Sequence, residues 1–407
     1  MLLKMKDMHY KFPQLNLALQ IEFVVVQYVH SEDKLYFQQK GIFIMTRLHS
    51  IKEAQKVLQT IGEKTTIIFK GTFGIAKSTL LSSFDANKYT LAYIDCANLE
   101  LGDLAIPVVD QTKMETNWAP NSRFGLYEAS RSGKPLVIML DELGKANVAV
   151  INMLLPLILE RRIGDRKIPN GSIVFATTNF ESDSVGDMIP AHGYNRVTVM
   201  NLHGPSPEEW AVWATNNDID PILISWILEN KHAFDTYIHQ PTGIPLESNH
   251  FIYKPERQDL LQFVTPRSLT HCSPILNKRD SLGYELTQSL IEGTVGSAAA
   301  MSIRAHAEQN DKLPKIEDVL KNPETCDLPP PLLNFLMVVK LVIEMKPETI
   351  EPLSVYASRL NSPEALGLLC NLTMQKTILL NHLRDSKTFN EISNKYLEIY
   401  LFNLKQR

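Results

Sequence analysis

The stretch that most constrains this chain is residues 67–80, where a short apolar strand pattern runs through a glycine-bearing turn into a helical pattern. The turn reads Gly71-Thr72-Phe73-Gly74-Ile75-Ala76-Lys77-Ser78-Thr79. A phosphate-binding loop requires this context, because its backbone N–H groups and the helix N-terminus surround the phosphates. We therefore predict that Gly71–Thr79 binds a nucleotide. Lys77 would reach the β- and γ-phosphates, and the Ser78 hydroxyl would bind Mg²⁺.

The loop departs from the usual pattern at one position, because Ala76 stands where a glycine normally precedes the lysine. A methyl group removes no N–H donor, so binding is unaffected if Ala76 has a negative φ. If the loop needs a positive φ there, the alanine costs about 1–2 kcal/mol. The sequence leaves both cases open, together with a simple glycine turn that precedes Lys-Ser.

Strand-like apolar runs alternate with segments long enough to hold a helix. The runs are Thr65–Phe69, Leu91–Asp95, Leu136–Leu140, Ser172–Thr178 and Arg196–Leu202. This alternation predicts an α/β fold in which helices cover both faces of a parallel sheet. The unbroken apolar run at 136–140 is typical of a strand buried on both faces.

Polar residues follow two of these runs at the point where each strand would end: Asp141-Glu142 and Asn179. Ligands of open α/β sheets bind beyond the carboxyl ends of the strands. Asp141 can hold Mg²⁺ through water, and Glu142 can deprotonate an attacking water that the Asn179 amide holds in line. The ordinary alternatives are a helix cap for the acidic pair and a turn former for Asn179.

Two segments between the strands have their own patterns. Gly164-Asp165 lies between short basic segments and predicts a small hairpin. Residues 101–124 contain Trp118 and Phe124 but no motif, and we expect each aromatic to be an ordinary buried side chain.

Taken together, these segments resemble the AAA+ ATPases and, within them, the MoxR-type branch of chaperone-like ATPases. The resemblance covers roughly residues 46–325. Its motifs, in order, are GTFGIAKS at 71–78, VIMLDELGKA at 137–146, LPLILERRIGDRKIPNGSIVFATTN at 155–179, NRVTVMNL at 195–202 and TPRSLTH at 265–271. It implies a P-loop core followed by an α-helical lid, with ATP and Mg²⁺ as cofactors and ATP hydrolysis as the activity.

The resemblance also implies roles for individual side chains. Glu142 matches the catalytic base and Asn179 the first sensor residue. Arg196 matches the arginine finger that acts on the nucleotide of an adjacent subunit, and Arg267 the sensor arginine of the lid. Such guanidinium groups neutralise charge that develops on the γ-phosphate. The alternatives are a surface residue beside a strand for Arg196 and a salt bridge at a helix start for Arg267.

A finger that acts on a neighbour requires a ring of subunits, which we expect to be a hexamer. Relatives of this branch often act on a client together with a von Willebrand factor A domain protein, so the resemblance implies those partners. Inserts at the position of residues 101–124 line the pore of such rings, which makes substrate contact the second interpretation of Trp118 and Phe124.

These considerations divide the chain into four parts. Residues 1–44 form an N-terminal arm, 45–203 the nucleotide-binding domain, 204–325 the lid and 326–407 a helical extension after Pro329–Pro331. An amphipathic pattern runs from Met45 through Ile61, and we hypothesise that translation starts at Met45; a genuine arm is the alternative. Within the lid, Ser206-Pro207 predicts a capped helix start, and one helix is expected from about Gly283 to Gln309.

Composition limits the partners and the compartment. The net charge of −4, from 41 basic and 45 acidic residues, shows no general nucleic-acid footprint. The four cysteines form no CxxC pair, and we find no apolar run long enough to span a bilayer and no convincing secretory signal. We therefore expect a cytoplasmic protein that does not bind membranes.

Two other functions remain open at this stage. One is an AAA+ motor that acts on nucleic acid, such as a helicase loader or translocase, for which only the basic side chains of Arg161, Arg162, Arg166 and Lys167 argue. The other is a scaffold that binds ATP without hydrolysing it, which Ala76 keeps open.

Overall fold

The computed structural model describes residues 47–180, 195–256, 261–310 and 312–405, with side chains as far as residue 396. The arm at residues 1–44 and the hypothetical start at Met45 lie outside these residues. The domain boundaries expected at 203/204 and 325/326 stay predictions.

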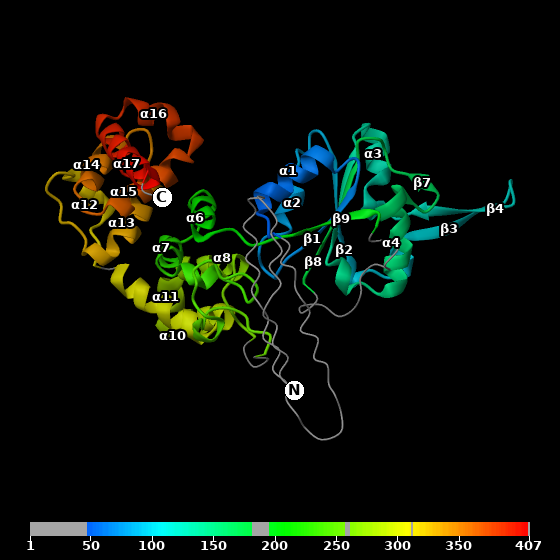
Figure 1. Cartoon of the computed structure of the whole chain (residues 1–407), viewed down its shortest axis with the longest axis horizontal. Helices are drawn as coiled ribbons and strands as arrows, with labels where there is room; N and C mark the ends of the chain where they lie inside the picture. The colour runs from blue at the N-terminus through cyan, green and yellow to red at the C-terminus, as the bar shows by residue number, and fades with distance from the viewer. Residues whose placement is uncertain (1–46, 181–194, 257–260, 311, 406–407) are drawn as a thin grey trace, which may run out of the picture. The chain divides into compact units, whose positions relative to one another are not determined.

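A parallel sheet forms the first part of the described chain (Figure 1). Among the described residues its five strands lie in the order β2-β5-β8-β1-β9, and every neighbouring pair is parallel. Their bounds are β1 Thr66–Lys70, β2 Thr90–Asp95, β5 Leu136–Asp141, β8 Ile173–Thr178 and β9 Val197–Asn201. Each end differs from the predicted one by at most one residue, so the expected fold class is confirmed.

Both faces of the sheet are buried because alternate residues of each strand point to opposite sides. On one face, Ile68, Ile138 and Val174 join a cluster with helices α3 (Leu126–Ser132) and α4 (Val148–Glu160). On the other face, Ile67, Val137 and Phe175 pack with α1 (Ile51–Ile61) and α2 (Thr79–Ser82). The sheet is therefore sandwiched by helices, and the continuous apolar runs follow from burial on both sides.

Two helices on the second face depart from the sequence prediction. Helix α1 begins at Ile51 rather than at Met45, because the Ser50 side chain accepts a hydrogen bond from the Glu53 N–H and closes a capping box there. Helix α2, which follows the phosphate loop, is only four residues long. A single turn aligns few peptide dipoles, so α2 adds less positive potential to the loop than a full helix would.

Two hairpins lie on the same side of the core. The first pairs β3 (Ala105–Asp110) with β4 (Glu115–Pro120) and extends away from the sheet (Figure 1). The second pairs β6 (Arg162–Ile163) with β7 (Arg166–Lys167), as predicted. Asp165 joins them, because its carboxylate accepts a hydrogen bond from the Trp118 backbone N–H. Trp118 is 44% exposed, so its expected burial was wrong, whereas Phe124 is buried.

The chain after β9 is helical. Its helices are α6 Pro207–Thr215, α7 Pro221–Glu229, α8 Pro266–Asn277, α9 Arg279–Leu282, α10 Tyr284–Val295, α11 Ser297–Asn310, α12 Ile316–Lys321, α13 Asn334–Glu344, α14 Ile350–Ser358, α15 Pro363–Met374, α16 Leu380–Asp385 and α17 Lys387–Lys405. One hydrophobic cluster, from Trp210 to Ile392, runs through this region. Across the described residues, every helix is too short or too polar to cross a membrane.

The start of α6 was predicted correctly, whereas the helix expected from Gly283 to Gln309 was not. Ser206 caps α6 through a capping box, and Pro207 occupies its first turn. The second prediction fails at Gly296, which has a φ of +85° and separates α10 from α11. A left-handed residue cannot continue a right-handed helix, so the chain turns there.

Candidate nucleotide site

The loop Gly71–Thr79 joins β1 to α2 and has two residues in the left-handed region. Gly74 has a φ of +67° and Ala76 a φ of +69°. Glycine adopts this conformation freely, whereas for alanine it costs about 1–2 kcal/mol. The loop therefore needs a positive φ at the position of the unusual alanine, and the costly alternative is the one that the structure shows.

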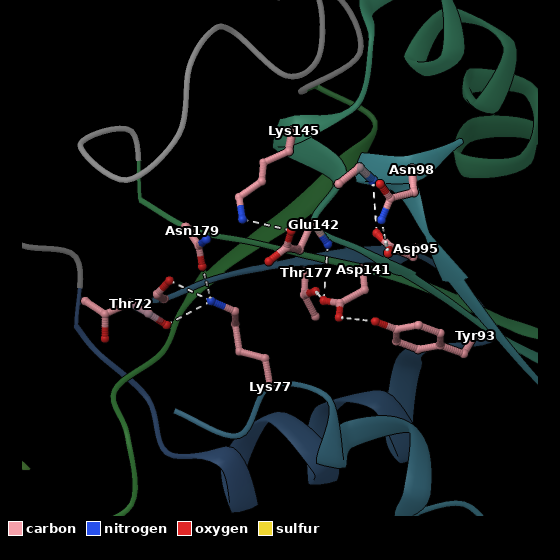
Figure 2. Close-up of polar contacts among 12 residues, drawn as sticks. Thr72, Lys77, Tyr93, Asp95, Asn98, Asp141, Glu142, Lys145, Thr177 and Asn179 are labelled. Atoms are coloured by element: carbon pink, nitrogen blue, oxygen red, sulfur yellow. Dashed lines mark hydrogen bonds and ion pairs between the residues drawn. The ribbon is translucent and has the colours of Figure 1, made fainter. Parts of the chain in front are cut away.

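The Lys77 ammonium group is buried and bonded inside the loop. It donates hydrogen bonds to the carbonyl oxygens of Gly71 (2.8 Å) and Thr72 (2.9 Å) and to Asn179 Oδ1 (2.6 Å), as Figure 2 shows. These three acceptors use all three N–H donors of a lysine. A phosphate that contacts Lys77 must therefore replace at least one of these bonds.

Asp141 lies at the carboxyl end of β5, between strands that supply its partners. Pairing of Leu140 with Ala176 places Thr177 beside it, and the Thr177 hydroxyl donates to Asp141 Oδ1. The Glu142 N–H also donates to Oδ1 (3.1 Å), while the Tyr93 hydroxyl from β2 donates to Oδ2 (2.8 Å), as drawn in Figure 2. The carboxylate thus accepts hydrogen bonds on both oxygens and is held in one orientation.

Glu142 follows at a sharp turn of the backbone. Its φ of +52° is unusual for a non-glycine residue, and such residues gather at functional sites. Its Oε2 forms an ion pair with Lys145 Nζ at 2.8 Å, and both side chains are partly exposed. The carboxylate that we assigned as the base is therefore held by a lysine one turn further along the chain.

The two predicted arginines occupy different environments. Arg196 is exposed in the turn before β9. Arg267 lies in the first turn of α8, where its backbone N–H donates to the Gly74 carbonyl at 3.3 Å. Thr265, the N-cap of α8, lies so close to Gly74 that a Cβ there would be 2.5 Å from the Thr265 Oγ1. The start of α8 is thus packed against the phosphate loop.

The structure brings Lys77, Asp141, Glu142 and Asn179 together at the carboxyl ends of the strands (Figure 2). Ser78 and Thr79, which follow Lys77 in the chain, are exposed. Sequence reasoning missed Tyr93 and Thr177 and set Lys145 aside. Tyr93 precedes the end of its strand by two residues and carries no motif. A signal for Thr177 was available, because it lies two residues before Asn179 in a strand whose neighbour ends in Asp141.

The residues present suit a magnesium nucleotide. Among the described residues, no group of three His, Cys, Asp or Glu side chains lies close enough together to hold a metal ion by itself. Mg²⁺ in nucleotide sites takes one or two protein oxygens and shares the phosphates of its ligand. Ser78 and Asp141 are donors of that kind.

No family model matches the sequence, and no curated protein matches it either. Solved structures to which this chain is similar include a closed state of Hsp104 with ATPγS and FITC casein (14% identity, TM-score 0.29, 59% of this chain and 41% of that chain). Others are a proposed ATPase from Cytophaga hutchinsonii (12%, 0.26, 84% and 79%) and C. elegans PCH-2 (15%, 0.32, 64% and 68%). This chain spans less than half the length of the Hsp104 chain.

The strand order, the phosphate loop after β1 and the helical region after β9 give the chain an AAA+-like P-loop architecture.

Proposed function

We propose that this chain is a MoxR-like AAA+ ATPase that hydrolyses Mg-ATP in a ring of six subunits and remodels a partner protein. The observation that carries the proposal is the meeting of the phosphate loop with two strand ends. The hydrogen bond between Lys77 Nζ and Asn179 Oδ1 joins residues 102 positions apart in the chain. A lysine, a pair of carboxylates and an amide at one sheet edge are the parts that phosphoryl transfer to water requires.

Each residue then has a defined task. Backbone N–H groups of Gly71–Thr79 surround the phosphates, and Lys77 exchanges its loop carbonyls for phosphate oxygens. Ser78 and Asp141 would hold Mg²⁺, which would supply positive charge to neutralise the phosphates. Glu142 accepts the proton of the attacking water, and Asn179, once Lys77 has turned to the nucleotide, orients that water. Arg267 on α8 adds positive charge from the helical region.

The ring rests on the contrast between the two cations. Lys77 is buried in its own loop, whereas Arg196 is exposed before β9 and is open to another molecule. A guanidinium that completes a neighbour's site is worth roughly 10³–10⁵ in rate. Arg196 in that role makes hydrolysis depend on assembly.

The β3–β4 hairpin offers a surface for the client. Its side chains Ile106, Val109 and Met114 are exposed by 57%, 65% and 88%. Large exposed apolar groups on one element mark interaction surfaces rather than chance exposure. We assign this hairpin to contact with the client protein. A von Willebrand factor A domain protein would act together with the client, as in relatives of this branch.

The test is the ATPase rate of the full chain against protein concentration, for wild type and Arg196→Ala. We expect the specific ATPase activity of wild type to rise with concentration and that of the variant to be at least a thousandfold lower. A mixture of the two should be less active than its wild-type fraction would be alone. A rate that is independent of concentration and of Arg196 would refute the shared site. Arg123→Ala, which removes an exposed arginine paired with Asp103, is the matched control.

A scaffold that binds ATP without turnover is the second candidate, favoured by the strained Ala76 and the internal bonds of Lys77. Both features oppose phosphate binding without preventing it. The wild-type ATPase rate separates the two functions. Three of the four basic residues that favoured nucleic acid make contacts within the chain: Arg161 bonds to the Gly62 carbonyl, Arg162 pairs with Glu160, and Arg166 lies over the Tyr127 ring. The fourth, Lys167, is exposed.

A further inference from the structure

The hydrogen bond between Tyr93 and Asp141 has no place in the mechanism above. Tyr93 lies on β2, the edge strand next to β5, and pairs with Met139, two residues before Asp141. Its hydroxyl reaches forward along the neighbouring strand and donates to Asp141 Oδ2 at 2.8 Å (Figure 2). Packing alone does not explain this contact, because Tyr93 is 53% exposed.

The hydrogen bonds of Asp141 show what the contact does. An ionised carboxylate has about four acceptor positions, two on each oxygen. Thr177 Oγ1 and the Glu142 N–H occupy the two positions on Oδ1, and Tyr93 occupies one on Oδ2. One position on Oδ2 is left, so the carboxylate offers a single acceptor in a fixed direction.

The Tyr93 hydroxyl is the donor of this bond, because an ionised carboxylate can only accept hydrogen bonds. The phenol proton is therefore directed at Oδ2. A phenylalanine would keep the ring and remove only this bond.

We propose that Tyr93 is a positioning residue that orients the Asp141 carboxylate, so that the remaining acceptor on Oδ2 is available to Mg²⁺ or its hydration shell. This inference rests on the proposed function, because it assumes that Asp141 serves a magnesium nucleotide. Removing a partner that orients a metal ligand in this way lowers the metal affinity about 10–100-fold.

The experiment measures nucleotide binding rather than hydrolysis. A fluorescent ADP analogue is titrated into the full chain, first in EDTA and then at increasing Mg²⁺, for wild type and Tyr93→Phe. We expect the variant to bind within twofold of wild type in EDTA and to need roughly tenfold more Mg²⁺ to reach half of its full affinity gain. Tyr89→Phe is the matched control, since Tyr89 immediately precedes β2 and its ring contacts Phe84.

The outcomes separate this proposal from the proposed function. If wild type does not bind the analogue under either condition, the nucleotide site itself is wrong. If wild type gains affinity with Mg²⁺ and Tyr93→Phe shows the same midpoint within twofold, Tyr93 does not orient Asp141. A variant that loses affinity in EDTA as well, or that melts several degrees lower, would assign Tyr93 to packing and overturn the proposal.

Discussion

The acidic side of the candidate site is fixed by the sheet, whereas the phosphate loop is held by bonds to itself and by the start of α8. Asp141 accepts hydrogen bonds from Tyr93 on β2, from Thr177 on β8 and from the backbone N–H of the next residue, Glu142. Its position therefore follows from strand pairing. Lys77 instead bonds to two carbonyls of its own loop and to a single side chain outside it, Asn179 after β8. The acidic side is therefore organised before any ligand binds, and the loop must exchange bonds when one does.

The cost of that exchange falls on a loop that is already strained. Ala76 has a positive φ, and the helix after the loop has a single turn. Both features weaken phosphate binding relative to a glycine followed by a long helix. The proposed base Glu142 and the proposed phosphate-binding loop lie on different elements, so substitutions can test them separately.

Within the acidic side and the loop side, the largest expected effect is on chemistry alone. Glu142→Gln should lower the ATPase rate at least a hundredfold, because an amide cannot accept the proton of the attacking water. Nucleotide affinity should stay within twofold, because the loop is unchanged. Rates are measured by phosphate release and affinity by titration of a fluorescent analogue.

Glu160→Gln is the control for loss of an acidic group. Glu160 is the last residue of α4 and is paired with Arg162. A Glu142→Gln variant that hydrolyses ATP at a tenth of the wild-type rate would exclude Glu142 as the base. One that fails to bind nucleotide would show that the acidic side and the loop side are not separable.

Gly74→Ala tests the loop side and its contact with α8. The new Cβ would lie 2.5 Å from Thr265 Oγ1, and the residue would also carry the strain of a φ of +67°. We expect a loss of stability of about 2–4 kcal/mol from strain and overpacking together, and roughly tenfold weaker nucleotide binding. Denaturant titration and analogue binding measure the two quantities.

Gly133→Ala isolates the strain from the collision. Gly133 has a φ of +69°, and nothing lies within 4 Å of the position that a new Cβ would take, so its replacement should cost about 1–2 kcal/mol and leave binding unchanged. Equal losses in the two variants would mean that the contact between the loop and Thr265 contributes nothing.

The sequence predicts the acidic side better than the loop side. Apolar runs located every strand of the sheet, and the positions after two of them located Asp141 and Asn179. Tyr93 was not predictable, because its bond depends on the register between β2 and β5, which no local pattern encodes. The φ of Ala76 was equally undetermined, since the same residue type adopts either sign and tertiary contacts decide.

Ala76→Gly tests the strain of the loop through an expected gain. Glycine would remove about 1–2 kcal/mol of strain, offset by about 0.4–1 kcal/mol from the greater freedom of the unfolded chain. We expect a small rise in stability and up to roughly threefold tighter nucleotide binding, with the turnover of bound ATP unchanged. Ala146→Gly, at a φ of −67°, should instead lose stability. No change in Ala76→Gly would show that the strain is released elsewhere.

The smallest expected effect lies outside both sides of the site. In the helical region, Ser225, His306 and Glu229 form a chain of contacts at 2.7 and 3.4 Å. The arrangement resembles a hydrolytic triad, but Ser225 is fully buried and also bonds to the carbonyls of its own helix. Burial raises the pKa of Glu229 to about 7 and lowers that of His306 to about 4.

These two shifts act in opposite directions, and of the two groups only Glu229 titrates in the folded state above pH 6.5. Because its pKa is higher in the folded than in the unfolded chain, the folded state releases its proton later, and stability falls as pH rises through about 7. His306 offsets part of this loss, because in the unfolded chain it releases its proton near pH 6.5. Between pH 6.5 and 8 we expect wild type to lose about 0.5 kcal/mol, or roughly 1 °C in Tm, and Glu229→Gln to lose none. Nucleotide binding by the two proteins should respond to pH identically. A pH dependence of nucleotide binding that disappears in Glu229→Gln would show that the helical region controls the phosphate loop. The loop and the helical region would then respond to the same titrating group.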